Sequence, residues 1–466
     1  MKIFSIISFP AKSRMLRLAF LLCFLIFVNE RSVNAQPNLL MFDAQSIPQT
    51  SFNHPSYLPK ARYYFGMPIS SSNNFMYANN AFSYHDLVHK RSDDSLVIDI
   101  DKVYGQFHKN NFISLNFQCE LLTWGFYVKN NYFNFDVTER ANLYFSFSGD
   151  LMNLIYKGNG PYIGQTLDFS KTGFDVSHFR QYAAGMARQI LPNLSGGIRF
   201  KYLYGMENFS TTRGKFSMYT AADDYHLVIN SGVEVNTSST LNTDDDVKVS
   251  KYLFGLGNRG YAFDLGSDYK YNDKWTFSFS LVDLGAIKWK AYVKRYRVPE
   301  GSYTFNGVDL KKFLNSDSSG SAQEVLDSLS NAFDTEESNE SYSAPLPGRL
   351  YLNGKYKINE KSFASALIYS MFFKGTRQSA VMLSYHRMAG KHFELGAGWS
   401  YINHTFDNLG ILIALNAGAF QYYIHSDNIL GTLSPTNFRT TQTHFGINFR
   451  FQREGPKGAV AETSAN

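Results

Sequence analysis

The chain has 466 residues, of which 18% are charged and 16% are aromatic, and its formal net charge is +6. The charged fraction lies below the quarter that is usual for soluble domains. The positive charge forms no basic stripe, so the sequence gives no reason to expect a nucleic-acid partner.

The first 35 residues have the pattern of an export signal. A basic stretch precedes the apolar run Leu18–Val28, which is too short for a membrane-spanning helix but suits a signal peptide. The small residue Ala35 predicts cleavage there, so we expect residues 1–35 to be a signal peptide. Loss of Cys23 would leave Cys119 alone, which excludes an intramolecular disulfide and a metal centre built on paired cysteines.

Residues 36–109 are predicted to form an N-terminal periplasmic or plug segment that leads into the first strand. This region carries the aromatic stretches P-K-A-R-Y-Y-F-G and N-N-F-M-Y. Stretches as aromatic as these indicate an ordered segment, and a plug tucked into a barrel is one way to order it.

Residues 110–451 show the alternation of β-strands. Between Gly197 and Gly205, Ile198 and Phe200 alternate with Arg199 and Lys201. A helix would place the charges all round itself, whereas a strand separates the two sets onto two faces. Strands are predicted near 195–206, 212–220, 225–237, 258–271, 275–297, 346–357, 362–373, 378–388, 393–402, 409–416, 419–426 and 439–451.

The connectors between these strands predict the class of fold. Counted back from the C-terminus, the short polar connectors fall on one side and the long loops, including 298–345, on the other. Short periplasmic turns and long outer loops are typical of outer-membrane barrels. We therefore expect an all-β, transmembrane antiparallel barrel with an even number of strands, about 14–16. A soluble sandwich is disfavoured because it would bury mid-strand charges in a dry core.

Two segments outside the strands have less regular patterns. In the predicted extracellular loop 298–345, Val308–Leu314 and Glu324–Phe333 have helical spacing, which fits either a cap or plug, or a mobile surface loop. Residues 452–466 are small, polar and rich in Gly and Pro, and are predicted to form a flexible C-terminal tail.

The stretch Gly255–Gly260 (G-L-G-N-R-G) has the spacing of a dinucleotide-binding loop, with Asp283 where a ribose-binding carboxylate is expected. Such a loop must open a helix, but the residues after Gly260 alternate as a strand, so no cofactor is predicted. Asp283 shares its parity with Phe277 and should face lipid, unless a bulge at Asp283 and Gly285 turns it inward or the strand has already left the membrane there.

The predicted lumen-facing charges are the residues with the most functional promise. They are Arg188, Arg199, Lys201, Asp264 and Asp268. They would set selectivity in a pore, or pair across the lumen and brace the barrel. Bracing is favoured because acids and bases occur in similar numbers.

No catalytic or metal site is predicted. Asp223–His226 (D-D-Y-H) could supply a carboxylate–imidazole pair, but the strand count places it in a short periplasmic turn, where it is expected to be an ordinary polar turn. Asp244–Asp246 lacks the spacing of a calcium loop and is interpreted as a solvated loop.

Several sequence blocks carry a family resemblance. They are Leu121–Glu139, Asp150–Gly160, Gly197–Gly205, Gly257–Gly266, Ser280–Trp289 and Ala344–Tyr351. On these blocks the chain resembles a family of uncharacterised outer-membrane β-barrels from Bacteroidota that defines a domain of unknown function. It is more distantly similar to long-chain fatty-acid transporter barrels and to accessory barrels of type IX secretion. The resemblance implies a fold and a location but no functional residues.

Two functions stay open at this point. The chain is expected to be a non-catalytic barrel of the cell outer membrane, in contact with membrane lipid. It would either transport small or hydrophobic molecules, or serve as a closed platform or accessory subunit for surface or secretion machinery. The platform would bind periplasmic or surface proteins through its long loops or its tail.

Overall fold

The computed structural model describes residues 38–452, except 213, 244–246, 306–334, 375 and 403–404. These residues form a closed antiparallel barrel of 14 strands, which confirms the predicted fold class. The predicted signal peptide, the helical stretches Val308–Leu314 and Glu324–Phe333, the Asp244–Asp246 run and the tail after 452 lie outside the described residues. No helix in the described ranges is long and apolar enough to span a membrane.

The barrel closes between its last and first strands. The first strand is split into β1 (Ala61–Gly66) and β2 (Asn73–Asn79), and both halves pair with β25 on one side and β5 on the other. A second wall strand is split into β18 (Tyr342–Pro345) and β19 (Gly348–Asn359). The continuous wall strands are β5 (Asn110–Val128), β6 (Asn131–Ser148), β8 (Gly173–Leu191), β9 (Leu194–Thr212), β13 (Arg259–Lys270), β14 (Trp275–Trp289), β20 (Ser362–Phe373), β21 (Thr376–Ala389), β22 (Phe393–Ile402), β23 (Thr405–Ala417), β24 (Phe420–Ser426) and β25 (Thr440–Gln452).

The two faces of the wall differ as the alternation requires. In β13, Tyr261 and Phe263 are exposed on the outer face, whereas Ala262 and Asp264 are completely buried on the inner face. Further exposed aromatic residues line the outside of the other strands. They include Phe65, Phe75, Phe117, Phe200, Phe277, Phe279, Trp399, Tyr422, Phe445 and Phe449. Exposed apolar residues in a continuous belt are expected where a barrel meets lipid.

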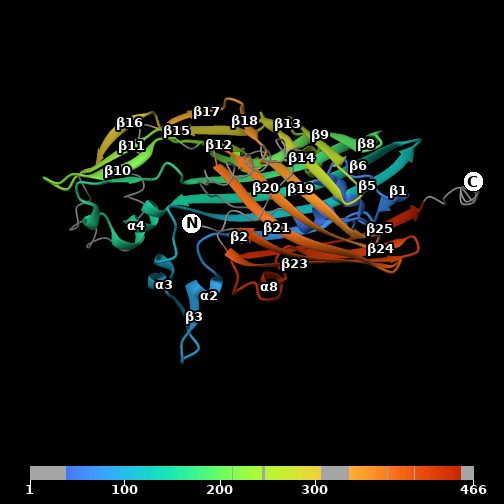
Figure 1. Ribbon diagram of the computed structural model, residues 1–466. Helices are drawn as coiled ribbons and strands as arrows, with labels where there is room; N and C mark the ends of the chain where they lie inside the picture. The colour runs from blue at the N-terminus through green and yellow to red at the C-terminus, as the bar shows by residue number, and fades with distance from the viewer. Residues whose placement is uncertain are drawn as a thin grey trace, which may run out of the picture.

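Tight turns gather at one end of the barrel, to the right in Figure 1, where β5 meets β6 and β8 meets β9. The long connections, such as those from β6 to β8 and from β24 to β25, lie at the opposite end, which we call the outer end. The asymmetry is less strict than predicted, because β20–β21 and β22–β23 also connect within a few residues at the outer end.

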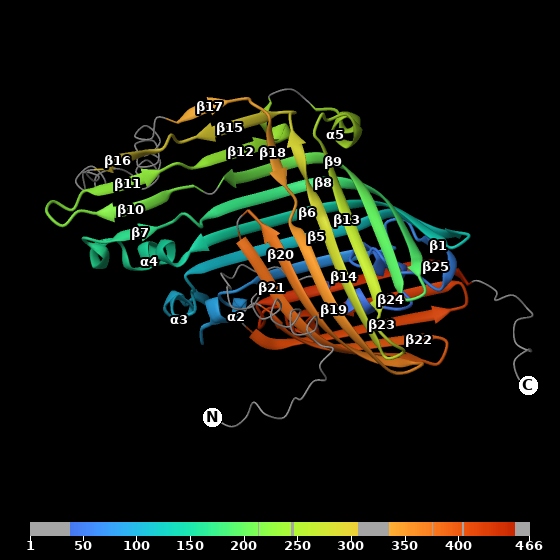
Figure 2. The ribbon, with the colours of Figure 1, turned by 45° about the horizontal axis from the view of Figure 1, so that its top comes forward.

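Beyond the outer end the wall continues as an outer extension (Figure 2). The end of β9 leaves β13 and pairs with β12 (Glu234–Ser238), which is followed by β15 (Val293–Arg297) and β17 (Glu336–Ser338). A separate four-stranded sheet contains β7 (Thr166–Asp168), β10 (Phe216–Thr220), β11 (Leu227–Ser231) and β16 (Gly301–Phe305). The segments 212–220 and 225–237 were therefore wrongly predicted as wall strands, because they pair with each other and with these outer strands.

Short elements complete the described chain. The helices are α2 (Tyr84–Leu87), α3 (Ile100–Tyr104), α4 (Gly149–Lys157), α5 (Val249–Phe254) and α8 (Ile429–Leu433), and the 3-10 turns are η1 (Leu40–Asp43), η2 (Pro48–Phe52), η3 (Gly160–Tyr162) and η4 (Thr240–Asn242). The hairpin of β3 (Val88–Lys90) and β4 (Leu96–Ile98) stands apart from the barrel.

Residues 38–60, which we call the plug, lie inside the barrel. The η1 residues Leu40 and Phe42 and the following Ile47 are at most 1% exposed, and they pack against inward-facing residues of the wall. The wall makes room for the plug with glycine. A Cβ on Gly197 would lie 2.0 Å from the carbonyl oxygen of Pro55, and one on Gly266 would lie 2.9 Å from the backbone nitrogen of Ser56.

Gly197→Ala is therefore expected to displace the plug. Its new methyl group would meet backbone rather than a movable side chain, and overpacking of this kind costs about 1–3 kcal/mol. We expect a non-specific protease to cleave within residues 38–60 of the refolded variant faster than in the unchanged protein, with fragments identified by mass spectrometry. Gly354→Ala is the matched control, because its Cβ would meet nothing closer than 3.6 Å. Equal protection of the plug in both variants would contradict this close fit.

Candidate functional site

Two wall carboxylates fix the first part of the plug. Asp427, which follows β24, accepts hydrogen bonds from the backbone amides of Leu39 and Leu40 at 2.7 and 3.0 Å. Glu394 in β22 accepts from the backbone amides of Gln45 and Ser46 at 2.6 and 2.7 Å. Asp427 thereby satisfies the first amides of η1, which have no partner within the turn, and Glu394 satisfies two amides of the link between η1 and η2. The plug is thus held through its backbone, independently of most of its side chains.

Other strands of the wall hold the plug through side chains. Asp43 in η1 forms an ion pair with Lys355 in β19 at 3.0 Å and accepts a hydrogen bond from Ser365 at 2.7 Å. Nε2 of His54 lies 2.6 Å from Oδ1 of Asp268 in β13. Contacts to opposite sides of the wall prevent the plug from sliding without breaking buried polar interactions.

Asp283 occupies an irregularity in β14. The register of β14 against β13 shifts by one residue between the pairs Phe263–Leu284 and Leu265–Leu281. Asp283 has a φ of 61°, a value that non-glycine residues rarely adopt, and its amide donates to Asp264 at 2.8 Å. This bulge turns the side chain into the lumen, where the residue is 1% exposed.

Asp283 lies at the centre of a buried group of charges that we call the ionic cluster. Its carboxylate is 3.0 Å from Arg140, 2.5 Å from Lys201 and 2.6 Å from Arg349. Lys201 also pairs with Asp264 at 2.7 Å, and Arg199 pairs with Asp136 and Asp264. The cluster therefore links β6 through the lumen to the neighbouring strands β9, β13, β14 and β19.

Three cavities follow one another along the lumen. The outer cavity, of about 70 Å³, is bounded on one side by apolar residues and on the other by polar residues of β5, β6, β8 and β9, including Asp175, which pairs with Lys374 at the cavity. The middle cavity, also about 70 Å³, shares Asn116, Asn142, Pro347 and Met371 with it. The inner cavity, of about 20 Å³, lies against the plug and shares Asn38, Gln118, Arg140 and Arg349 with the middle one. A volume of this size holds about one water-sized group.

The structure separates the residues that the sequence had grouped. Arg199, Lys201 and Asp264 lie in the ionic cluster, whereas Asp268 contacts the plug. Arg188, contrary to expectation, is exposed on the outer side of β8, because its inward-facing neighbour is the buried Ala187.

The bulge also differs in position from the expected one. Its extra residue lies at Val282–Asp283, whereas Gly285 keeps a regular pair with Ala262. A Cβ on Gly285 would lie 2.0 Å from the carbonyl oxygen of Tyr261. Gly285 therefore permits close approach of two strands beside the bulge.

Several functional residues were not identified from the sequence. Asp136 could have been, because Asn134, Asp136 and Thr138 alternate with Phe133 and Phe135 as an inward-facing set. Arg349, Glu394 and Asp427 give no comparable signal, because each is an isolated charge whose partners are distant in the chain.

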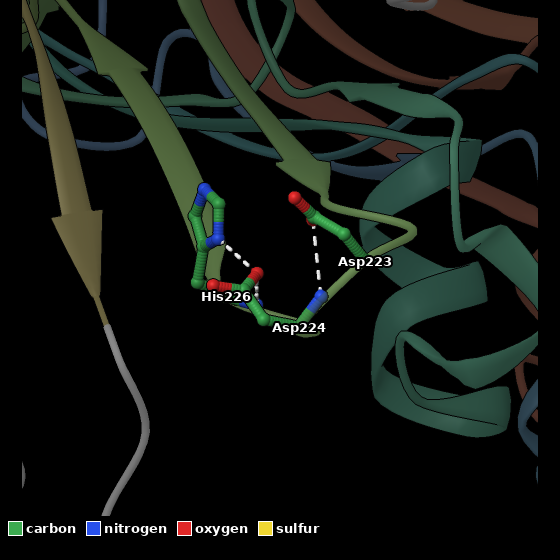
Figure 3. Close-up of side chains that lie close together, drawn as sticks. All are labelled: Asp223, Asp224 and His226. Atoms are coloured by element: carbon green, nitrogen blue, oxygen red, sulfur yellow. Dashed lines mark hydrogen bonds and ion pairs between the residues drawn. The ribbon is translucent and has the colours of Figure 1, made fainter.

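The Asp223–His226 turn lies elsewhere than predicted. It connects β10 and β11 in the outer extension, so its placement in a periplasmic turn was wrong. Asp223, Asp224 and His226 lie close enough to share a cation (Figure 3), and Nδ1 of His226 bonds the Asp224 carboxylate. The Asp224 side chain is 65% exposed. Exposed groups bonded within one turn give no geometry for catalysis.

Comparisons with known proteins give a family and a general likeness. A family model described as "Family of unknown function (DUF5723)" matches residues 55–427. No curated protein matches the sequence.

Solved barrels resemble the chain only loosely. The toluene transporter TodX of Pseudomonas putida is 9% identical, with 90% of this chain and 97% of that chain covered and a TM-score of 0.38. A FadL homologue of Pseudomonas aeruginosa is 10% identical, with 88% and 95% covered and a TM-score of 0.40. The translocator domain of the autotransporter NalP from Neisseria meningitidis is 7% identical, with 85% and 91% covered and a TM-score of 0.31. At this level of similarity, function has to be inferred from the geometry of the chain itself.

Asp283→Asn is expected to destabilise the barrel strongly. The substitution leaves Arg140, Lys201 and Arg349 with one carboxylate fewer in a buried site, and breaking a buried pair in this way costs about 3–5 kcal/mol. Denaturant unfolding of the barrel refolded in lipid vesicles measures the change. Asp223→Asn in the exposed outer turn is the control and should change stability by less than about 0.5 kcal/mol. Similar midpoints for the two variants would show that the ionic cluster does not brace the barrel.

Proposed function

The chain belongs to the family of unknown function DUF5723, and we propose that it is an outer-membrane transporter that admits small, mainly apolar molecules at its outer end. The observation that carries this proposal is the outer cavity. Ile287, Trp289, Leu346, Met371 and Phe373 supply one side of it. A few polar groups facing an apolar wall are typical of small-molecule sites.

A weak seam in the wall lies beside this cavity. Between the pairs Val282–Arg349 and Ala286–Pro345, the backbone amide of Leu346 bonds Gly285, while Pro347 has no amide hydrogen to donate. The seam therefore has fewer cross-strand hydrogen bonds than the wall around it. It gives an apolar molecule in the lipid a short path to the outer cavity.

The plug supports transport of selected molecules rather than general diffusion. It fills the inner part of the lumen and is bound to several wall strands through buried carboxylates. Passage would require the plug to shift, and a bound molecule that replaces some of its contacts would favour that shift. The outer-membrane location is supported by the closed barrel and its exposed aromatic belt.

The outer extension favours a second candidate, a platform for surface or secretion proteins. The continued wall strands and the separate four-stranded sheet project beyond the barrel, and their connections carry exposed apolar side chains, including Tyr225 and Leu241. A platform needs no ligand in the barrel, so binding at the outer cavity distinguishes the two functions. An origin in Bacteroidota and a relation to type IX secretion stay predictions from the sequence.

Filling the outer cavity should weaken binding there. Ala344 pairs with the inward-facing Ile287 and lines the cavity. We expect Ala344→Phe to weaken binding of the neutral probe phenylpropanol by about tenfold or more, because one side chain would occupy the space. Fluorescence of Trp289, which lines the same cavity, reports binding, and Trp289→Phe should remove the signal.

Ala397→Phe is the matched control. Ala397 is exposed on the outer face of β22, so the substitution adds the same volume outside the lumen. It should bind phenylpropanol as the unchanged barrel does. Absence of probe binding in the unchanged barrel, or equal binding in the two variants, would contradict the transporter and leave the platform.

A further inference from the structure

The outside of the wall changes in character toward the outer end of the neighbouring strands β9, β13 and β14. In β13, the exposed Phe263 is followed in that direction by Tyr261 and then by Arg259. In β9, Phe200 lies beside Phe263 and Tyr202 lies beside Tyr261. Phenylalanine against the hydrocarbon, tyrosine at its edge and charge beyond it are the order expected where a barrel leaves the membrane. Arg259 therefore lies at the level of the lipid headgroups.

Positive charges gather at this level. Arg259 is directly opposite Lys288 of β14, and both side chains are exposed on the outer face. Lys290, also exposed, follows just after β14, and we call these three residues the basic rim. Within the described part of the chain, none of the three side chains has an ion-pair or hydrogen-bond partner. Like charges that face each other across a strand pair repel, so an anion between Arg259 and Lys288 would stabilise this part of the wall.

The helix α5 forms a ledge beside the basic rim. Tyr204, the neighbour of Arg259 in β9, donates a hydrogen bond from its hydroxyl to the backbone carbonyl of Tyr252 at 2.8 Å. This bond holds α5 against the outside of the wall, near the outer ends of β13 and β14 (Figure 2). Phe254 at the end of the helix is 70% exposed, and Lys251 is the single charged residue of the helix. The ledge thus adds apolar surface and positive charge, without adding an acidic group.

The surroundings of the basic rim indicate the chemistry of its partner. Arginine binds phosphate through several planar donors, and lysine binds it as a point charge. The cations stand on wall strands directly beyond the exposed rings of Tyr261 and Phe263. A soluble anion would contact the cations alone, whereas a lipid would also place its acyl chains against these rings. A lipid with an anionic headgroup therefore matches both parts of the surface.

We propose that the basic rim binds the phosphate group of an anionic lipid in the outer leaflet, with the acyl chains of this lipid on the exposed aromatic residues of β9 and β13. The site lies on the outside of the barrel, apart from the three cavities, and it does not depend on what the lumen transports. Lys288 also neighbours Ser343 of β18, so the bound lipid lies close to the weak seam of the wall.

The test compares two lipids with the same acyl chains, dioleoyl phosphatidic acid and dioleoyl phosphatidylcholine. Both contain phosphate, but the choline group of the second lipid cancels its charge. Native mass spectrometry of the refolded full-length barrel in detergent counts the bound lipids. We expect phosphatidic acid to bind about tenfold tighter or more, because each cation at a membrane surface adds to the attraction. The double variant Arg259→Gln/Lys288→Gln should lose most of this preference and bind phosphatidylcholine as before.

The double variant Lys90→Gln/Arg91→Gln is the matched control. It also removes one lysine and one arginine, but from the hairpin that stands apart from the barrel, so both affinities should stay unchanged. The exchange Arg259→Lys/Lys288→Arg keeps both charges in place and should retain the preference. Lys290→Gln changes the third cation of the basic rim and should weaken the binding of phosphatidic acid alone.

Inorganic phosphate serves as a competitor and separates a lipid site from a site for a soluble ion. At the same concentration as phosphatidic acid it should displace little of the lipid, because it makes no contact with the aromatic residues. Displacement at equal concentration would assign the basic rim to a soluble anion and overturn the lipid site.

Other outcomes would also contradict the proposal. Equal binding of the two lipids by the unchanged barrel would show that the headgroup charge is not recognised. An undiminished preference in Arg259→Gln/Lys288→Gln would place the anionic lipid elsewhere on the barrel. An equal loss of preference in Lys90→Gln/Arg91→Gln would reveal an effect of overall charge, with no local site.

Discussion

The buried carboxylate of Asp283 is the interaction on which the rest of the lumen depends. It binds Arg349 on the neighbouring strand β19 and Arg140 on β6, which β8, β9 and β13 separate from β14, so strands that are not neighbours in the wall are joined through the interior. A barrel of this strand number is wide enough to enclose water or a plug. Buried charges within it have to be paired or hydrogen-bonded, and the ionic cluster pairs seven of them at one level. That level separates the apolar outer cavity from the plug.

The bulge in β14 makes this arrangement possible. Without the register shift, Asp283 would follow the parity of Phe279 and point outward into lipid, where an ionised carboxylate is very unfavourable. The shift places Val282 and Asp283 together on the inner side, both almost completely buried. The backbone amide of Asp283 donates a hydrogen bond to Asp264. One residue of the ionic cluster thus stabilises the irregular backbone that positions another.

The fold could be predicted because alternation, turn chemistry and exposed aromatics depend on residues close in the chain. Arg199, Lys201 and Asp264 were placed in the lumen for the same reason. Arg188 was assigned to the wrong face. It lies near the end of β8, and an error of one residue in the alternation moves a side chain from one face of the strand to the other. The Asp223–His226 turn was assigned to the wrong end because β10 and β11 alternate as wall strands do but pair outside the barrel. The plug contacts of Asp427 and Glu394 could not be derived, since they join segments more than 300 residues apart.

The central claim is that the plug closes the lumen to water while the outer cavity stays accessible. Planar-bilayer conductance tests it most directly, on the full-length chain and on a variant lacking residues 38–58. The full-length barrel should show no stable conductance, and the deletion should conduct in steps, because removal of the plug leaves a polar path along the inner face of the wall. Stable stepwise conductance by the full-length protein would contradict a closed lumen.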